Sequence, residues 1–279
     1  MSITGINIAL FPQVTSFSSF CEIFKEYPTT KIEFPIQLWL KLKEKKSVLK
    51  NLEVVGVSGI LHKTELFPLS IFTDEKTFES QLLILDKKIH HINELNCSNV
   101  SVGIDAWCIY EKNYANGIFI NRVRIIADYL KKTSVNLNLE YISPQVARNN
   151  GDNSLFLFCS SLKESLKIIE MVDRSNVFLL LDFLHWFCDN SGITIKNIKD
   201  YIGFVHLCDH TENKASKIKD IGRVLPYEGI LPVDLFIQEL SLISYNKPMT
   251  IEVFANAAYQ PSNAQIKNSL TKIGENFGT

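Results

Sequence analysis

The chain has 279 residues, of which 46% are hydrophobic, and its formal net charge is −1. This length suits one large domain with a sizeable core. Because the charge is close to zero, bulk electrostatic attraction to nucleic acid or to an anionic membrane is excluded as the basis of binding. No apolar stretch approaches the ~20 residues of a membrane span, and the N-terminus lacks the basic and apolar regions of a signal peptide. We therefore expect a soluble, cytoplasmic protein.

The first half of the chain alternates apolar runs with segments of helical periodicity. Strands are predicted at Ile3–Leu10, Lys31–Phe34, Leu52–Ile60 and Asn99–Ile104, and helices at Phe17–Tyr27, Gln37–Asn51, Thr73–Leu95 and Gly117–Lys132. Thr73 is the predicted N-cap of the third helix, because acidic residues follow it and suit a helix N-terminus. The Lys-rich part of the second helix is interpreted as a solvated face.

The second half continues this alternation. Strands are predicted at Val135–Glu140, Val177–Asp182, Tyr201–His206 and Met249–Phe254, and helices at Leu162–Arg174, Asn197–Asp200, Val233–Ser244 and from Asn263 onward. The polar segment from Cys208 to Gly229 is typical of a binding loop. Eight strands alternating with helices predict an α/β fold, a (β/α)8 TIM barrel, with residues 1–279 as a single domain. A doubly wound open sheet is the alternative, but no GxGxxG follows the first strand, so a dinucleotide site there is not favoured.

Six cysteines are dispersed along the chain without a CxxC pair: Cys21, Cys97, Cys108, Cys159, Cys188 and Cys208. Nearly all of them lie in or beside apolar runs. This distribution favours reduced, buried thiols over a disulfide framework.

Four later strands each end on a polar residue that can bind a metal ion, namely Glu140, Asp182, His206 and Glu252. Each residue alone could be a helix cap, a surface ion pair or a structural histidine. Together they occupy equivalent positions on consecutive strands, and the C-terminal ends of barrel strands carry the active sites of such folds. Neighbouring strands lie ~4.8 Å apart, so four inward side chains can meet around one ion. The set suits a divalent cation such as Mn, Mg, Co or Zn.

The alternation of side chains along a strand supplies a check on this interpretation. If Glu140 points inward, Asn136 and Asn138 do so as well. Both are polar for a barrel interior, so they need hydrogen-bond partners there. On the next strand, Leu180 and Phe178 share the face of Asp182, as a filled barrel requires.

Four motifs together resemble one family. They are Asp182-Phe-Leu-His185, His206-Leu-Cys-Asp209, Gly222-Arg223 followed by Pro226-Tyr-Glu-Gly229, and Ile251-Glu252. In order and spacing they are similar to motifs of the xylose isomerase-like TIM barrel superfamily, which contains sugar phosphate isomerases and epimerases. The sharp motifs lie after about residue 135. The family often has Pro-Gly-x-Gly where this chain has Pro226-Tyr227-Glu228-Gly229.

The resemblance implies a divalent metal ion bound by Glu140, Asp182, His206 and Glu252. It implies that Glu140 and Glu252 also exchange protons with a substrate. It places His185 and Arg223 on substrate oxygens, with Asp209 beside them as an orienting group. These residue types suit movement of a carbonyl along a sugar through an enediolate, because a metal ion polarises the carbonyl while carboxylates remove and return a proton.

The sequence therefore predicts a metal-dependent isomerase or epimerase of a small sugar, sugar phosphate or keto-polyol. A dehydratase of the same superfamily and a non-catalytic carbohydrate-binding barrel are the alternatives. An endonuclease IV-like nuclease is not favoured, since the extra metal ligands that the resemblance would require are incomplete.

Two rim residues complete the predicted substrate site. His62 lies just past the third strand and Trp107 just past the fourth, and both could line the mouth. Trp186, past the sixth strand, could serve as a second apolar wall or as packing. The expected partner is a small carbohydrate, without nucleic acid or membrane, and a homo-oligomer is left open.

Overall fold

A computed structural model describes residues 4–11, 31–41, 52–60, 71–148, 152–189 and 191–277. In this part of the chain, eight parallel strands form a closed barrel in sequence order, and the last strand pairs with the first. The strands are β1 (Thr4–Asn7), β2 (Lys31–Pro35), β3 (Glu53–Ser58), β4 (Asn99–Ile104), β6 (Asn136–Tyr141), β8 (Val177–Asp182), β9 (Ile202–Leu207) and β12 (Met249–Ile251). The predicted (β/α)8 barrel is confirmed, and the open sheet is wrong. That residues 1–279 form a single domain stays a prediction.

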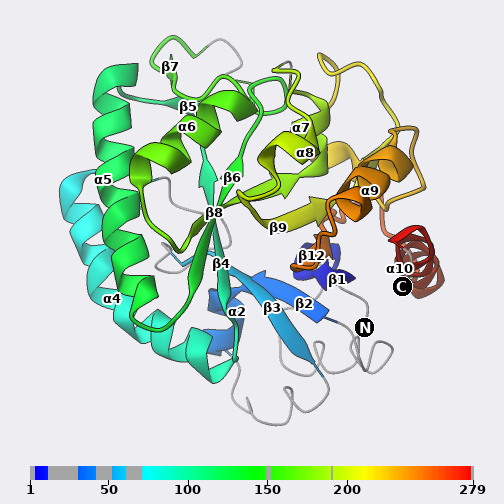
Figure 1. Cartoon of the computed structure of the whole chain (residues 1–279), viewed down its shortest axis with the longest axis horizontal. Helices are drawn as coiled ribbons and strands as arrows, with labels where there is room; N and C mark the ends of the chain where they lie inside the picture. Colours follow the sequence, from blue (N-terminus) through cyan, green and yellow to red (C-terminus); the bar gives the residue numbers. More distant parts are fainter. Residues whose placement is uncertain are drawn as a thin grey trace.

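Helices cover the outside of the barrel. They are α2 (Ile36–Lys41), α4 (Glu75–Glu94), α5 (Lys112–Lys131), α6 (Leu162–Val172), α7 (Phe183–Phe187), α8 (Ile195–Ile198), α9 (Val233–Leu242) and α10 (Asn263–Phe277). Figure 1 shows α4 and α5 along one side of the barrel and α9 beside α10 on the other. The helices bury their apolar faces against the strands, which is the arrangement that their 3.6-residue periodicity predicts.

Among the described residues, the hydrophobic core has two parts. The larger part contains most of the buried apolar side chains of the strands and helices, including Leu179, Phe183 and Phe236. A separate cluster contains Val55, Leu180 and Phe204. Because Leu180 and Phe204 lie two residues before Asp182 and His206, they share the inward strand face with these residues. The barrel interior is therefore packed below the strand ends and polar at them.

Several predicted boundaries are corrected by the structure. Asp74, not Thr73, caps α4, because its carboxylate accepts the backbone N–H of Thr77. Helix α5 begins at Lys112 rather than at Gly117, since an open surface position tolerates a glycine inside a helix. The first strand ends at Asn7, whose side chain caps a short 3₁₀ helix (Ile8–Leu10). Helix α6 ends earlier than predicted, where Asp173 takes a left-handed φ of 51°. Helix Phe17–Tyr27 and the end of Gln37–Asn51 fall outside the described residues.

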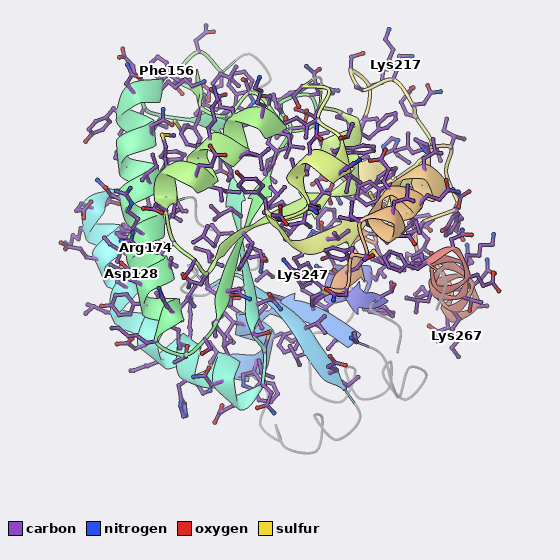
Figure 2. All side chains as sticks on the ribbon, in the orientation of Figure 1. Asp128, Phe156, Arg174, Lys217, Lys247 and Lys267 are labelled. Atoms are coloured by element: carbon purple, nitrogen blue, oxygen red, sulfur yellow. The ribbon has the colours of Figure 1, made fainter. Side chains whose placement is uncertain are left out.

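Short elements at the carboxyl ends of the strands were not predicted. Strand β5 (Trp107–Cys108) pairs with β7 (Phe156–Leu157), and β10 (Asp209–His210) pairs with β11 (Arg223–Val224) after a 3₁₀ turn, η3 (Asp220–Gly222). They are two or three residues long, too short for a periodic signal. Figure 2 places Phe156 of β7 and Lys217 of the segment between β10 and β11 at the same edge of the molecule.

The described cysteines and helices can be compared with what the composition predicts. Cys97, Cys108, Cys159, Cys188 and Cys208 are buried free thiols, while Cys21 lies outside the described residues. In the described part of the chain, no helix combines the length and the apolar character needed to cross a membrane.

Candidate functional site

Four side chains converge at the carboxyl ends of neighbouring barrel strands. Glu140 lies in β6, Asp182 ends β8, His206 lies in β9 and Glu252 directly follows β12. These strands are adjacent in the barrel, and Asp182 is paired with His206 across β8 and β9. One ligand atom of each residue lies within 4.8 Å of those of the other three. All four residues that the sequence singled out are thus gathered at one point.

Nδ1 of His206 lies among the three carboxylates. It is 3.2 Å from Oε2 of Glu252, 3.4 Å from Oε1 of Glu140 and 3.9 Å from Oδ2 of Asp182. In the described structure these three contacts have ion-pair distances, but none of them has the geometry of a hydrogen bond. An unsatisfied buried polar atom is costly. Its position among carboxylate oxygens is the arrangement that a bound cation would satisfy.

The other imidazole nitrogen faces a carboxylate that sequence reasoning missed. Nε2 of His206 lies 2.9 Å from Oε2 of Glu33 in β2. Oγ1 of Thr250 donates to the same oxygen over 2.7 Å, and Glu33 is 1% exposed. The sequence carried a usable signal, because a glutamate between Ile32 and Phe34 in a buried strand needs a partner.

Arg223 lies buried beside the four side chains. Its Nη1 donates to Oδ2 of Asp182 over 2.6 Å and lies 3.3 Å from Oε2 of Glu252. Its Nε donates to Oδ1 of Asp220 over 2.7 Å. Nη2 lies 3.5 Å from Nε2 of His185. Asp220 was not predicted, because a carboxylate in a polar loop carries no sequence signal of its own.

The spacing between Asp182 and His185 has a local cause. Asp182 is the N-cap of α7, and its Oδ1 accepts the backbone N–H of His185 over 3.0 Å. A side chain that caps a helix accepts from the residue two or three positions later. The imidazole of His185 is then fixed by the backbone N–H of Ser143, which donates to Nδ1 over 3.3 Å. The other ring nitrogen, Nε2, faces Nη2 of Arg223.

The buried charges shift one another's pKa values. Burial alone would raise the pKa of Asp182, but the charges beside it, that of Arg223 foremost, together outweigh burial and lower this pKa to about 2. Burial raises the pKa of Glu252 despite the opposing charge of His206. For His206, burial lowers the pKa, but the charges of Glu252 and Glu33 prevail and hold it well above its usual value. His206 and Arg223 are thus surrounded by four carboxylates, those of Glu33, Glu140, Asp182 and Glu252.

Asn138 points into the barrel, as the alternation check requires. It is fully buried, and its Nδ2 donates to Oδ1 of Asn99 and to the carbonyl of Val100, each over 3.3 Å. Its Oδ1 lies against Gly203, where a Cβ atom would come within 2.2 Å. Glycine therefore leaves room for this amide below Glu140. The strand parity predicted for β6 is consistent with the observed position of Glu140.

The carboxylate of Asp209 holds the backbone of a loop, instead of orienting a side chain of the site. Its Oδ1 accepts the backbone N–H groups of His210 and Leu231 over 2.7 and 2.9 Å, and its Oδ2 accepts that of Gly229 over 3.0 Å. A Cβ atom on Gly229 would lie 2.3 Å from Oδ1 of Asp209. This contact explains why glycine occupies that position.

The loop that Asp209 holds is also attached to the C-terminal helix. Three consecutive loop residues accept hydrogen bonds from side chains of α10. Oγ of Ser269 donates to the carbonyl of Pro226 over 3.0 Å, and Nδ2 of Asn276 donates to Oη of Tyr227 over 3.0 Å. Nε2 of Gln265 donates to Oε1 of Glu228 over 2.8 Å. Tyr227 has a left-handed φ of 72°. Its ring lies 5.7 Å from Nζ of Lys272 in α10, and this contact with the Asn276 hydrogen bond supports a bulky residue in a conformation that usually favours glycine.

The remaining predicted rim residues have different positions. Trp107 lies half-buried in β5, and its Nε1 donates to the carbonyl of Ala147 over 2.5 Å. Trp186 packs against Phe183 and Phe236, so it is part of the packing under α9. His62 lies outside the described residues.

Comparison with known proteins identifies the family. The family model described as "Xylose isomerase-like TIM barrel" matches residues 25–274. The chain belongs to the xylose isomerase-like TIM barrel family. It is 37% identical over 67 residues to a 2-oxo-tetronate isomerase of Haemophilus influenzae, covering 24% of this chain and 23% of that protein. It is 26% identical over 140 residues to an inosose isomerase of Bacillus velezensis, covering 48% and 45%. The chain thus spans less than half of the length of these relatives.

One solved structure has the same fold as this chain. It is described as "IOLI protein with a binding zinc atom" and has a TM-score of 0.75 and 16% identity, covering 99% of this chain and 98% of that one. At this identity the likeness concerns the fold alone.

The residues of this xylose isomerase-like barrel fit a divalent cation. Three carboxylates and one imidazole offer hard oxygen ligands and one nitrogen, and Nδ1 of His206 is available to complete the set. In the described residues, this is the one group of His, Cys, Asp and Glu side chains close enough to share an ion.

Proposed function

We propose that this protein is a metal-dependent isomerase or epimerase of a small carbohydrate. The observation that carries the proposal is the group of three carboxylates around the hydrogen-bond-free Nδ1 of His206, at the end of the barrel where such folds carry their active sites. The names of the curated relatives, an inosose isomerase and a 2-oxo-tetronate isomerase, support the same class of reaction.

The proposed cation is Mn, Mg, Co or Zn, held by Glu140, Asp182, Nδ1 of His206 and Glu252. When bound, such an ion supplies a Lewis acid that polarises the substrate carbonyl. The negative charges that now face His206 and Arg223 are the ones that would balance it.

Glu140 and Glu252 are the proposed proton carriers. One carboxylate removes the proton from the carbon next to the carbonyl, and the electron pair of that C–H bond moves to the carbonyl as an enediolate forms. A proton then returns to the neighbouring carbon in an isomerase, or to the opposite face of the same carbon in an epimerase. Glu140 and Glu252 come from β6 and β12, with β8 and β9 between them, so they can flank a substrate. Burial raises the pKa of Glu252 toward neutral pH, which suits a carboxyl group that both takes up and returns a proton.

Arg223 and His185 are the proposed donors to substrate oxygens. Nε and Nη1 of Arg223 are engaged by carboxylates, so Nη2 is the nitrogen left to meet a substrate. Nε2 of His185 lies 3.5 Å from it and is its proposed partner donor, in the tautomer in which Nδ1 accepts from Ser143. Two donors at this spacing suit one hydroxyl or two adjacent hydroxyl groups. His62 and Trp107 remain proposed contacts at the mouth.

Solvent deuterium exchange tests the proposal. A panel of ketoses, keto-polyols and sugar phosphates is incubated with the metal-loaded protein in D₂O, and deuterium in the substrate is measured by mass spectrometry. Exchange should occur with the wild type and fall by about 10²–10⁴-fold in Glu140→Gln and Glu252→Gln. Glu53→Gln, an exposed glutamate of β3, is the matched control.

The outcomes separate the alternatives. A metal-binding protein that exchanges no substrate proton would be a non-catalytic carbohydrate-binding barrel. Exchange accompanied by loss of water would indicate a dehydratase. Unchanged exchange in both glutamine variants would refute the roles given to these carboxylates.

A further inference from the structure

His206 is held from the side of the barrel that carries no metal ligand. Its Nε2 contacts Oε2 of Glu33 at 2.9 Å, and both side chains are buried, 2% and 1% exposed. A carboxylate held ionised can only accept, so the imidazole must place a proton on Nε2 to make this hydrogen bond. The same oxygen accepts the hydroxyl of Thr250 over 2.7 Å, so the surrounding geometry makes Oε2 of Glu33 an acceptor.

The position of the proton decides which nitrogen can bind a cation. A neutral imidazole has one N–H, so a proton on Nε2 leaves a lone pair on Nδ1. Nδ1 is the atom that lies among Glu140, Asp182 and Glu252. The other tautomer would direct an N–H at the cation position and leave Nε2 without a donor for Glu33.

Glu33 is in turn fixed by its neighbours. Thr250, which is paired with His206 across β12 and β9, donates its hydroxyl to Oε2 of Glu33 over 2.7 Å. Asn7, which is paired with Glu33 across β1 and β2, also hydrogen-bonds to it. Nδ2 of Asn7 donates to Oε1 of Glu252 over 3.2 Å as well. The side-chain amide of Asn7 therefore links Glu33 to Glu252, which is also a proposed metal ligand.

We propose that Glu33 is the positioning residue of the metal centre, and that it acts by holding His206 in the Nε2–H form. Asn7 of β1 and Thr250 of β12 hold Glu33 of β2 in place, so β1 and β2, which carry no ligand, contribute to the orientation of His206 on β9 and of Glu252 after β12. Carboxylates that orient a ligating imidazole in this way typically contribute 10–100-fold to metal affinity. The inference rests on the proposed function, because it requires that the four side chains bind a cation.

Glu33→Gln is the central test, because it keeps the shape of the side chain and removes the charge. Zn²⁺ affinity is measured by competition with a chelator at neutral pH. We expect a loss of 10–100-fold in Glu33→Gln and no change in Glu53→Gln, a glutamate on the exposed end of β3. A Glu33→Gln affinity within twofold of the wild type would overturn the proposal.

Nitrogen NMR of the Zn²⁺-loaded wild type provides a readout that a merely structural role would not move. With ¹⁵N-labelled histidine, the His206 signals should show a proton on Nε2 and metal ligation at Nδ1. A proton on Nδ1, or metal ligation at Nε2, would refute the assignment whatever the affinities are.

Thr250→Val keeps the proposal testable if Glu33→Gln does not fold. The hydroxyl is removed with little change of shape, so we expect Zn²⁺ affinity to fall by less than in Glu33→Gln. Where both variants fold, the double variant should bind no more weakly than Glu33→Gln alone, since the hydroxyl acts only through Glu33. Additive losses of Zn²⁺ affinity in the double variant would show that Thr250 does not act through Glu33.

Metal binding by the wild type and by Glu33→Gln distinguishes a failure of the proposed function from a failure of the role given to Glu33. If the wild type binds none of Zn²⁺, Mn²⁺, Mg²⁺ and Co²⁺, the proposed function fails and the role of Glu33 with it. If the wild type binds one of them and Glu33→Gln binds it equally well, only the role of Glu33 is refuted.

Discussion

Nη1 of Arg223 lies 2.6 Å from Oδ2 of Asp182, and both side chains are almost fully buried. The oxygen that accepts from Arg223 is also the oxygen of Asp182 that lies 3.9 Å from Nδ1 of His206. Arg223 therefore holds one of the proposed ligands in position before any cation arrives.

Replacing Arg223 should destabilise the metal-free protein more than the metal-loaded one. Arg223→Met leaves the carboxylate of Asp182 buried without its partner, which typically costs about 3–5 kcal/mol. A bound cation would supply part of the missing positive charge. Urea unfolding with a chelator and with saturating metal measures the two losses.

A surface arginine is the matched control for this variant. Arg174 pairs with Asp128 at the protein surface, where Figure 2 shows the two side chains together. Exposed ion pairs contribute little, so Arg174→Met should leave stability nearly unchanged. Equal losses for Arg223→Met with and without metal would argue against compensation by a cation.

Added cation should raise the thermal midpoint of the wild type. At about 100 times the dissociation constant, binding to the native state contributes about 2.7 kcal/mol, or roughly 5–10 °C for a protein of this size. His206→Asn removes the imidazole from the four-residue group and should abolish most of the increase. Differential scanning fluorimetry with Mn²⁺, Mg²⁺, Co²⁺ and Zn²⁺ measures it, and an equal increase in the variant would place the cation elsewhere.

The metal-free protein should lose stability as the pH rises above about 6.5. The pKa of His206 is raised well above 6.5 in the folded chain, where the charges of Glu252 and Glu33 outweigh burial. The native state therefore holds a proton that the unfolded chain releases, so this contribution is complete below about pH 6.5 and disappears as the pH passes the folded pKa. Thermal midpoints in chelator between pH 6 and 9 measure the slope. The slope should be smaller in His206→Asn, and an unchanged slope would assign it to other groups.

Two glycine substitutions should have opposite effects. In Gly229→Ala, the new methyl group would lie 2.3 Å from Oδ1 of Asp209 and 2.4 Å from the carbonyl oxygen of His210, so we expect a loss of about 1–3 kcal/mol. In Gly117→Ala, no atom lies within 4 Å of the new methyl group. Because Gly117 lies inside α5, alanine should stabilise the protein by about 0.5–1 kcal/mol. Chemical unfolding of both variants checks the signs, and stabilisation by Gly229→Ala would contradict the described contact.

The parts of the site that the sequence predicted are those set by strand periodicity. Glu140, Asp182, His206 and Glu252 each follow an apolar run, and parallel strands bring such endings to one edge. Glu33 was missed because it lies inside its strand, between two buried apolar residues, rather than at its end. Asp220 was missed for another reason. Its contact with Arg223 depends on the β10–β11 pairing, and these strands are too short for a periodic pattern to predict.

The boundaries that differ also have local physical causes. Asp182 both ends a strand and caps α7, so a helix begins directly after the strand, where no helix was predicted. Asp74 replaces Thr73 as the cap of α4 because the two residues have similar capping ability and only the backbone conformation decides between them.

The attachment of the loop at Pro226–Glu228 to α10 has a practical consequence for work with this protein. Side chains spread along the whole of α10, from Gln265 to Asn276, hold the loop whose backbone is fixed by Asp209. Shortening the chain within α10, or fusing a bulky partner against that helix, would therefore disturb the Pro226–Glu228 loop, which follows Arg223 closely in the chain. Affinity tags and immobilisation chemistry are better kept away from this helix when activity is the quantity being measured.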